Sequence, residues 1–232
     1  MGVQVSEFAC GSVAVGACIS HRVCDGTTMA SFLREWSETA ATGDSCGGGP
    51  VMTEGAGRFP ARSMRLNMTG GMTGERDIVT RRMTGNLWQV AVSPMVEIEK
   101  SKEIEVQELA QVVKKTIRKI DGDYVRKLEG KDGELGVYEV LKSLKEAMFL
   151  VAEKGIPCYS FSSWIRFEFY ETQFGWGKPT WACTIGVPIR NVVVLMPTKC
   201  GEGIEAWVTL NHLHMAQFEK NPYLLQFASF DP

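Results

Sequence analysis

The sequence predicts an α/β protein. Three observations predict this class: a β-prone hairpin at the N-terminus, amphipathic helices in the first half and the middle of the chain, and a C-terminal third made mostly of short strands. The chain has 232 residues, of which 44% are hydrophobic and 22% charged. This composition is typical of a globular protein that buries one large core or two small ones.

The N-terminal part predicts a hairpin followed by a helix. Residues 3–20 predict two strands interrupted at Cys10-Gly11, and residues 21–26 form the connecting turn. Thr27 or Thr28 is a natural N-cap for a helix that ends near Thr42. Its apolar residues recur at helical spacing: Met29, Phe32, Leu33, Trp36 and Ala40. The next segment, residues 43–85, is rich in glycine and lacks a sustained period.

The second half predicts helices and then strands. A strand is expected over residues 86–94. A charged helix beginning near Ser101 is expected to face inward with Val106, Leu109, Val113, Ile117 and Ile120. A further helix should run from about Gly136 to Glu153. The remaining expected elements are strands over 159–170, 181–189, 192–196 and 204–210, a turn at 199–203, and a short helix over 214–220.

Composition excludes several functional classes. The formal net charge of −2 gives no basic footprint for nucleic acid. Seven cysteines show neither a CxxC pair nor regular spacing, so we expect neither a disulfide framework nor a metal site. No apolar run approaches membrane-spanning length, and no basic region precedes an apolar one at the N-terminus. We therefore expect a cytoplasmic protein with no membrane partner.

A candidate general base lies in the turn after the hairpin. His21 is one of three histidines, and Asp25 follows it by four residues. A histidine has an ordinary pKa of about 6.5, so near neutral pH its ring can accept a proton from a hydroxyl. Asp25 can orient that ring or hold the turn. Taken alone, the pattern fits a structural turn equally well.

A second pattern, Gln-Phe-Gly-Trp-Gly-Lys-Pro, occupies residues 173–179. Its glycines permit positive φ and its proline fixes φ, so a rigid loop is predicted. The loop contains no obvious acid, base or nucleophile. We interpret it as a packed loop in which Trp176 staples two strands, so it identifies a fold rather than a chemistry.

Together these patterns resemble the BAHD acyltransferase family of plants, whose signatures are HxxxDG and, toward the C-terminus, DFGWGKP. The matching residues are His21, Asp25, Gly26, Phe174, Gly175, Trp176 and Gly177. Residues 159–179 and 198–208 also resemble family segments, and we favour the vinorine synthase-like branch. The resemblance implies a chloramphenicol acetyltransferase-like fold, with mixed sheets, flanking helices and an incomplete N-terminal domain. Residues 1–84 would be that partial domain, with the Gly-rich segment, and residues 85–232 the C-terminal domain.

The resemblance also implies an acyl-CoA-dependent O-acyltransferase that transfers an acetyl group to an alcohol of a plant secondary metabolite such as an alkaloid. His21 would deprotonate the alcohol, whose oxygen attacks the thioester without a covalent enzyme intermediate. Asp25 and Gly26 would be structural. Ser162 and Trp164 match a substrate-lining position and could donate hydrogen bonds to the oxyanion, although Trp164 also fits a packed strand residue. The partners would be the alcohol and acetyl-CoA, the latter a co-substrate rather than a permanently bound cofactor.

The chain departs from the family in three places. Gln173 stands where the family has Asp, the region before Val3 is absent, and an internal block is missing between Arg82 and Gly85. That block normally supplies the arginine that pairs with the motif aspartate. We therefore expect Asp25 to lack its usual partner, and a buried carboxylate without one is costly.

One other interpretation remains open, and a metal site is not predicted. The missing blocks fit an inactive remnant that acts as a binding or interaction module, with an exposed apolar surface on the hairpin. His212 and His214 would share one face of a strand and could bind a metal, but no third ligand accompanies them.

Overall fold

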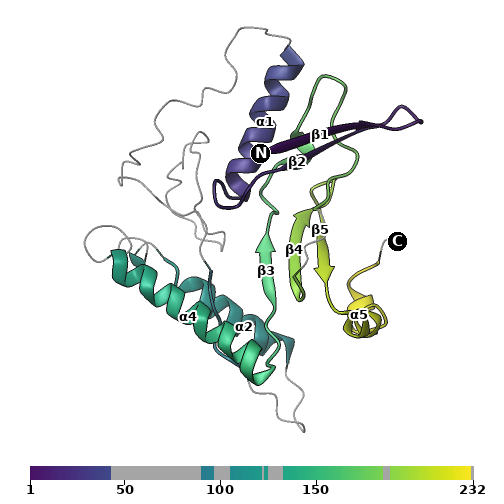
Figure 1. The fold of residues 1–232 in the computed structure, drawn as a ribbon. Coiled ribbons are helices and arrows are strands. Elements are labelled where there is room, and N and C mark those ends of the chain that lie inside the picture. Colours follow the sequence, from purple (N-terminus) through teal and green to yellow (C-terminus); the bar gives the residue numbers. More distant parts are fainter. Residues whose placement is uncertain (43–89, 97–104, 122, 125–132, 185–188, 231–232) are drawn as a thin grey trace. The chain divides into compact units, whose positions relative to one another are not determined.

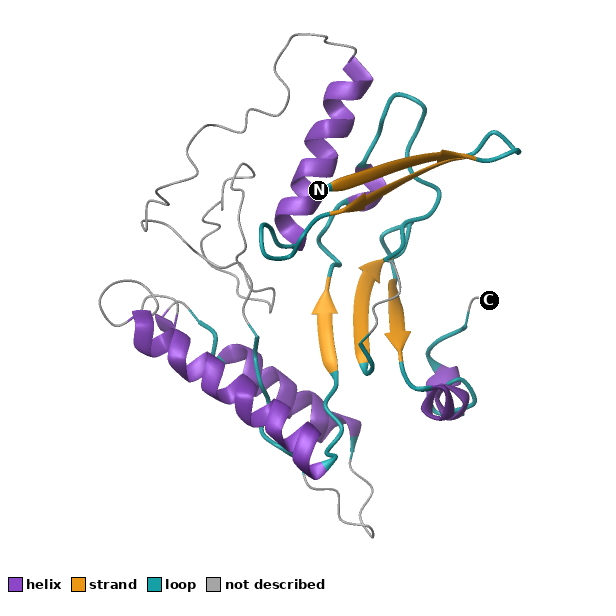
Figure 2. Ribbon diagram, viewed as in Figure 1, coloured by secondary structure: helices purple, strands orange, loops and turns teal. Residues whose placement is uncertain are grey.

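The computed structural model describes residues 1–42, 90–96, 105–121, 123–124, 133–184 and 189–230. The chain divides into two compact units, Met1–Thr28 with Val51–Gly155, and Met29–Pro50 with Ile156–Pro232. Both contain helices and strands (Figures 1 and 2). The predicted Gly-rich segment and the predicted domain boundary at residues 84 and 85 lie outside the described residues.

The first unit begins with the predicted hairpin. Strands β1 (Gly2–Glu7) and β2 (Val13–Cys18) pair antiparallel, with Val5 opposite Val15. Gly11 lies in the connecting turn at φ 83°, and its N–H donates to the Phe8 carbonyl at 2.8 Å. Positive φ is readily accessible to glycine, which explains why the strands separate at this point. The prediction of two strands interrupted at Cys10-Gly11 is confirmed.

The same unit contains helices α2 (Val106–Arg118) and α4 (Gly133–Lys154). Both helices were predicted. The prediction that the apolar side chains of α2 face inward is wrong for most of them. Val106, Leu109 and Val113 are 76%, 40% and 50% exposed, whereas Ile120 is buried after the helix ends. A helical period identifies an apolar face without specifying what covers it.

The strand predicted over residues 86–94 is absent where it can be checked. Residues 90–96 form no strand, and residues 86–89 lie outside the described part. A short apolar run does not supply the hydrogen-bonded neighbour that a strand requires.

The second unit contains a three-stranded sheet in the order β3-β4-β5. Strand β3 (Ser160–Ser163) runs parallel to β4 (Val192–Pro197), and β5 (Ile204–Thr209) is antiparallel to β4, so the sheet is mixed. The buried residues of this sheet lie on its central strand β4, namely Val193, Val194 and Met196. Helix α5 (His212–Phe218) follows the sheet, and most of helix α1 (Gly26–Thr42) belongs to this unit.

Two predicted strands are shorter or missing. The strand expected over 159–170 ends at Ser163. Its last hydrogen bond to the sheet is donated by the main-chain N–H of Trp164 to the Leu195 carbonyl at 2.7 Å. A 3₁₀ turn (Phe169–Glu171) follows. Residues 181–184 form no strand. There the Ala182 N–H donates to the buried Tyr170 hydroxyl at 3.3 Å. Aromatic residues favour strands in general, but here their rings pack with one another in a turn.

Candidate active site

The His21 turn (residues 20–25) connects strand β2 to helix α1. Ser20 closes it: its carbonyl accepts the Val23 N–H at 2.9 Å and the Cys24 N–H at 3.3 Å, and its hydroxyl accepts the Arg22 N–H at 3.3 Å. His21 is exposed, while Cys24 and Asp25 are each 7% exposed. The turn therefore presents an imidazole to solvent from a fixed backbone.

Asp25 is the residue that caps helix α1. Its Oδ1 accepts the Thr28 N–H at 2.8 Å, and the helix begins at Gly26. A carboxylate at this position satisfies a free N–H of the first turn and interacts favourably with the helix dipole. The predicted N-cap at Thr27 or Thr28 is therefore wrong by two or three residues. Asp25 has a partner within its own turn, although the family's arginine was expected to be missing.

The buried thiol of Cys24 lies next to this carboxylate. Burial raises the pKa of Cys24 above its ordinary value, and the charge of Asp25 raises it further. The thiol therefore stays protonated near neutral pH, and a protonated thiol is a poor nucleophile. The role of His21 as a proton acceptor stays a prediction.

The FGWGKP loop (residues 174–179) packs on helix α1 within the second unit. The ring of Phe174 meets Trp36 edge-on with the centroids 4.8 Å apart. Gly175 has φ 95°, and a Cβ built on it would lie 3.6 Å from the Ala41 Cα. Positive φ and close backbone approach both favour glycine at this position.

The prediction that Trp176 packs between two strands is wrong. Its side chain is 65% exposed and stacks on Phe174 with the ring centroids 5.5 Å apart. Phe174 is instead the aromatic residue of the loop that packs against helix α1. Gly177 has φ 118°, in the positive region that favours glycine. The predicted loop is thus present, but Phe174 rather than Trp176 anchors it.

Two residues of α1 that sequence reasoning missed also contact this region. Ser37 is completely buried, and its Oγ accepts the Gln173 N–H at 3.1 Å. Arg34 pairs with Glu168 at 3.1 Å between Nη1 and Oε2. The available signal was Ser37 itself, a polar residue four positions after Leu33 on an otherwise apolar stripe.

Ser162 and Trp164 lie at and just beyond the end of β3. The Trp164 Nε1–H donates to the Ser162 Oγ at 3.0 Å, and Ser162 is exposed. The indole ring also lies 6.0 Å from the rings of Phe167 and Phe169, so Trp164 belongs to an aromatic cluster. Because an indole has a single donor, the Trp164 N–H is already used. Ser162 is the acceptor of this bond.

The proposed basis for a metal site at His212 and His214 is wrong. Both residues lie in helix α5 rather than on a strand, so residues two apart point in different directions. Asn211 caps this helix through the His214 N–H at 2.9 Å, and its amide contacts the His214 Nδ1 at 3.0 Å. Within the described residues, no group of three His, Cys, Asp or Glu side chains could hold a metal ion. Among the same residues, no helix is both long and apolar enough to cross a bilayer.

Both signatures lie within residue ranges that match a family model. Residues 1–54 and 77–225 match the model of the Transferase family. The chain belongs to this family, the plant BAHD acyltransferases. Among solved structures, vinorine synthase matches with a TM-score of 0.61 and 21% identity, covering 92% of this chain and 63% of that one. This likeness confirms the predicted chloramphenicol acetyltransferase-like α/β fold.

Named relatives in the BAHD family are O-acetyltransferases. Limonoid 7-O-acetyltransferase of Citrus sinensis is 25% identical over 311 positions, covering 99% of this chain and 67% of the relative. Deacetylvindoline O-acetyltransferase of Catharanthus roseus is 29% identical over 305 positions, covering 98% of this chain and 68% of the relative.

The chain spans about two thirds of the length of these relatives. The first alignment has 311 positions against 232 residues, so at least 79 positions (311 minus 232) lie opposite gaps in this chain. Positions of that relative are therefore missing from within the aligned part of this chain. The location of the missing block between Arg82 and Gly85 stays a prediction.

Proposed function

We propose that the chain is an acyl-CoA-dependent O-acyltransferase that transfers an acetyl group to an alcohol of a plant secondary metabolite such as an alkaloid. The observation that carries this proposal is the His21 turn, where an exposed imidazole follows a rigid strand and precedes a capped helix. Membership of the BAHD family and the names of the O-acetyltransferase relatives support the reaction class.

His21 is the general base in this proposal. A ring nitrogen takes the proton of the alcohol while the alcohol oxygen attacks the carbonyl carbon of the thioester. The tetrahedral intermediate then collapses, the carbon–sulfur bond breaks, and the thiolate of coenzyme A takes the proton back from the imidazolium. Atoms and charges balance without an acyl-enzyme. The buried, protonated Cys24 thiol is consistent with direct transfer.

Ser162 is the hydrogen-bond donor that we assign to the oxyanion. Its hydroxyl is exposed and accepts the Trp164 indole N–H, which leaves the serine hydrogen available. Trp164 then orients Ser162 rather than binding the oxyanion itself. One such donor contributes about 3 kcal/mol to stabilisation of a transition state.

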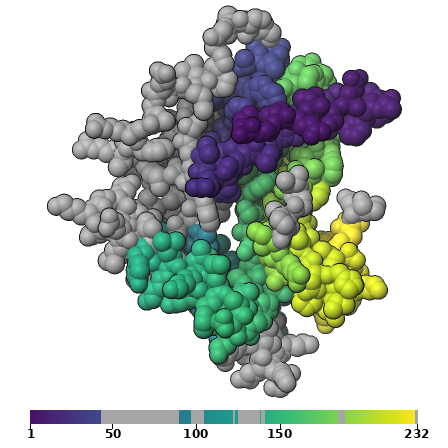
Figure 3. Space-filling model, in the orientation of Figure 1, coloured from purple at the N-terminus to yellow at the C-terminus, as the bar shows by residue number. Residues whose placement is uncertain are grey.

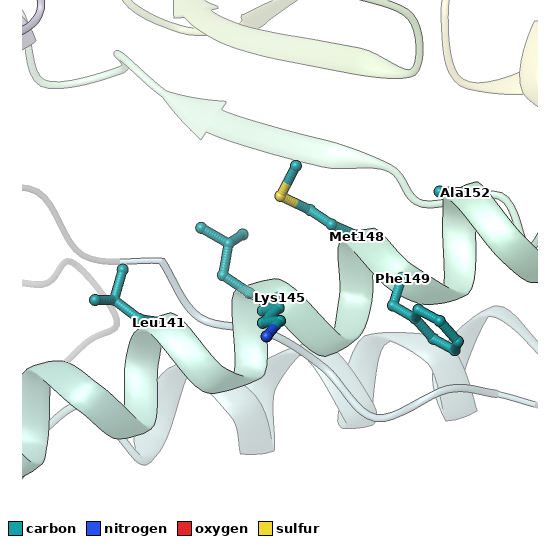
Figure 4. A pocket seen from close by; sticks show the side chains of 6 residues that line it. Leu141, Lys145, Met148, Phe149 and Ala152 are labelled. Atoms are coloured by element: carbon teal, nitrogen blue, oxygen red, sulfur yellow. The ribbon is translucent and has the colours of Figure 1, made fainter.

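A second candidate function, a non-catalytic interaction module, is favoured by exposed apolar side chains. On the hairpin, Val3, Val5, Phe8 and Val13 are 41%, 59%, 54% and 42% exposed, and the purple atoms of this segment lie open in Figure 3. On α4, an apolar hollow of about 470 Å³ is lined by side chains of that helix alone (Figure 4), namely Leu141, Leu144, Lys145, Met148, Phe149 and Ala152. The lining has no carboxylate, imidazole or hydroxyl that would serve acyl transfer.

Release of free thiol from acetyl-CoA separates the two candidates. Purified protein is incubated with acetyl-CoA and a panel of alcohols, beside His21→Ala and the matched control His212→Ala. The proposal expects alcohol-dependent release by the wild type and by His212→Ala, because His212 is an exposed histidine on α5. Release by the wild type no greater than that of His21→Ala would refute catalysis. Strong binding of a hydrophobic dye in that case would favour the interaction module.

A further inference from the structure

We propose that Ser37 is a positioning residue of the transferase: it ties the FGWGKP loop to helix α1, the helix that begins at the His21 turn. The inference rests on the proposed function, because positioning has meaning only if His21 is the base. It also makes a structural claim that can be tested without any activity.

Ser37 makes two hydrogen bonds from a completely buried position. Its Oγ–H donates to the Arg34 carbonyl at 2.8 Å, and the same oxygen accepts the Gln173 N–H at 3.1 Å. The first bond fixes the direction of the hydroxyl, so a lone pair points at the loop. Removing the oxygen would leave the part-buried Gln173 N–H without this acceptor, and losing one partner of a hydrogen bond costs more than replacing both.

Further contacts join α1 to the same part of the chain. Phe174 packs edge-on against Trp36, Gly175 approaches Ala41, and Arg34 pairs with Glu168. Ser37 lies in the middle of this stretch of the helix and is its most buried member. These contacts fix both the rotation and the axial position of α1 on the loop.

The other end of α1 carries the candidate chemistry. The helix starts at Gly26, directly after Asp25, whose carboxylate accepts the Thr28 N–H. His21 therefore precedes the first helical residue by five positions, in a turn closed by Ser20. Helix α1 is continuous from Gly26 to Thr42, so a change in the helix at Ser37 can be transmitted to the turn that precedes it. A displacement of about 1 Å at a reacting group costs roughly 100-fold in rate.

The link explains how the loop tolerates glutamine at the position where the family has aspartate. Gln173 contacts Ser37 through its main-chain N–H, and its side chain is exposed. Side-chain changes at residue 173 should therefore leave the link intact, whereas removal of the Ser37 hydroxyl should break it.

Amide hydrogen exchange measured by NMR tests the link. We expect the Gln173 N–H to exchange about tenfold faster in Ser37→Ala than in the wild type. Gln173→Ala, read at its own N–H, should keep the protection. The matched control is Thr39→Ala, which removes an exposed hydroxyl whose Oγ1 donates to the Glu35 carbonyl of the same helix at 2.8 Å. If Ser37→Ala does not fold, Ser37→Cys keeps the volume with a weak acceptor and should give the same result.

Kinetics on the folded variants test positioning. We expect kcat of Ser37→Ala to fall about tenfold or more with KM for acetyl-CoA unchanged, and Thr39→Ala to match the wild type. A purely structural serine would leave kcat per folded molecule unchanged, and that result would overturn the positioning role. Unchanged exchange at Gln173 would overturn the link itself. If the wild type releases no thiol, the proposed function fails together with positioning, while the exchange result still decides the link.

Discussion

The His21 turn and the FGWGKP loop are both short, but they are held in different ways. The turn is fixed by main-chain bonds to Ser20 and by the Asp25 cap, with the exposed imidazole between them. The loop is fixed by side chains of α1, chiefly the Trp36 ring and the buried Ser37 hydroxyl. Removing the exposed His21 side chain should therefore affect chemistry, whereas removing an anchoring side chain of the loop should affect stability.

In each region the most recognisable residue is exposed and its neighbours hold the structure. His21 is exposed beside the buried Asp25, and Trp176 is exposed beside the half-buried Phe174. For a base, exposure is a requirement, since it must reach a substrate. For Trp176, exposure means that a neighbouring residue anchors the loop.

The largest expected effect is on catalysis by His21→Ala. We expect acetyl transfer to fall by roughly 100-fold or more, because the variant lacks the proton acceptor. The free energy of unfolding should change by less than about 0.5 kcal/mol, since the side chain is exposed. Steady-state kinetics and urea unfolding check both. A large loss of stability would give His21 a structural role and weaken the contrast with the loop.

Next comes the loop, compared through its two aromatic residues. Phe174→Ala should lower the free energy of unfolding by about 2 kcal/mol, because it removes the ring that packs on Trp36. Trp176→Ala should cost about 0.5 kcal/mol, since only its stacking on Phe174 is lost. Denaturant midpoints measure both. Equal losses in the free energy of unfolding for the two variants would support the predicted role of Trp176 in packing between two strands.

The helix cap should give a smaller effect on stability. Asp25→Ala removes the acceptor of the Thr28 N–H and should cost about 1 kcal/mol. Asp25→Asn keeps an oxygen at the same place, so it should remain within a few tenths of a kcal/mol of the wild type. Thermal unfolding of both variants provides the measurement, and a loss in Asn as large as in Ala would argue against capping.

The smallest effect is on thiol reactivity. Burial raises the pKa of Cys24, whereas hydrogen bonding to Thr198 lowers the pKa of the exposed Cys200. At a given pH near neutrality, Cys24 therefore has the smaller thiolate fraction, and its alkylation rate should rise over a higher pH range. Mass spectrometry after timed iodoacetamide treatment ranks the two. Faster labelling of Cys24 would mean that the turn opens in solution.

Local patterns in the sequence predicted much of the fold. The hairpin, the α1 period up to Thr42, and strands β4 and β5 each depend on residues close together in the chain, and all are present. The segments at 90–94 and 181–184 depended on pairing with distant residues, which no local pattern specifies. The motif signatures supplied the family and the fold class, both of which the comparisons confirm.

The candidate site was predictable only in part. The two signatures identified His21, Asp25 and the loop from residue identity. They could not identify Ser37, because its role depends on an oxygen meeting an N–H that lies 136 positions later in the chain. The wrong prediction for Trp176 has the same cause, since what packs on the loop decides which of its aromatic residues is buried.

The central claim, direct acyl transfer with His21 as the base, is tested most directly by mass spectrometry of protein and product in one reaction. Wild type and His21→Ala are each incubated with acetyl-CoA and an accepted alcohol. The account predicts acetylated alcohol and unmodified protein from the wild type, and at most roughly 1% as much product from His21→Ala. An acetyl group on the wild-type protein, or equal product from the two proteins, would contradict it.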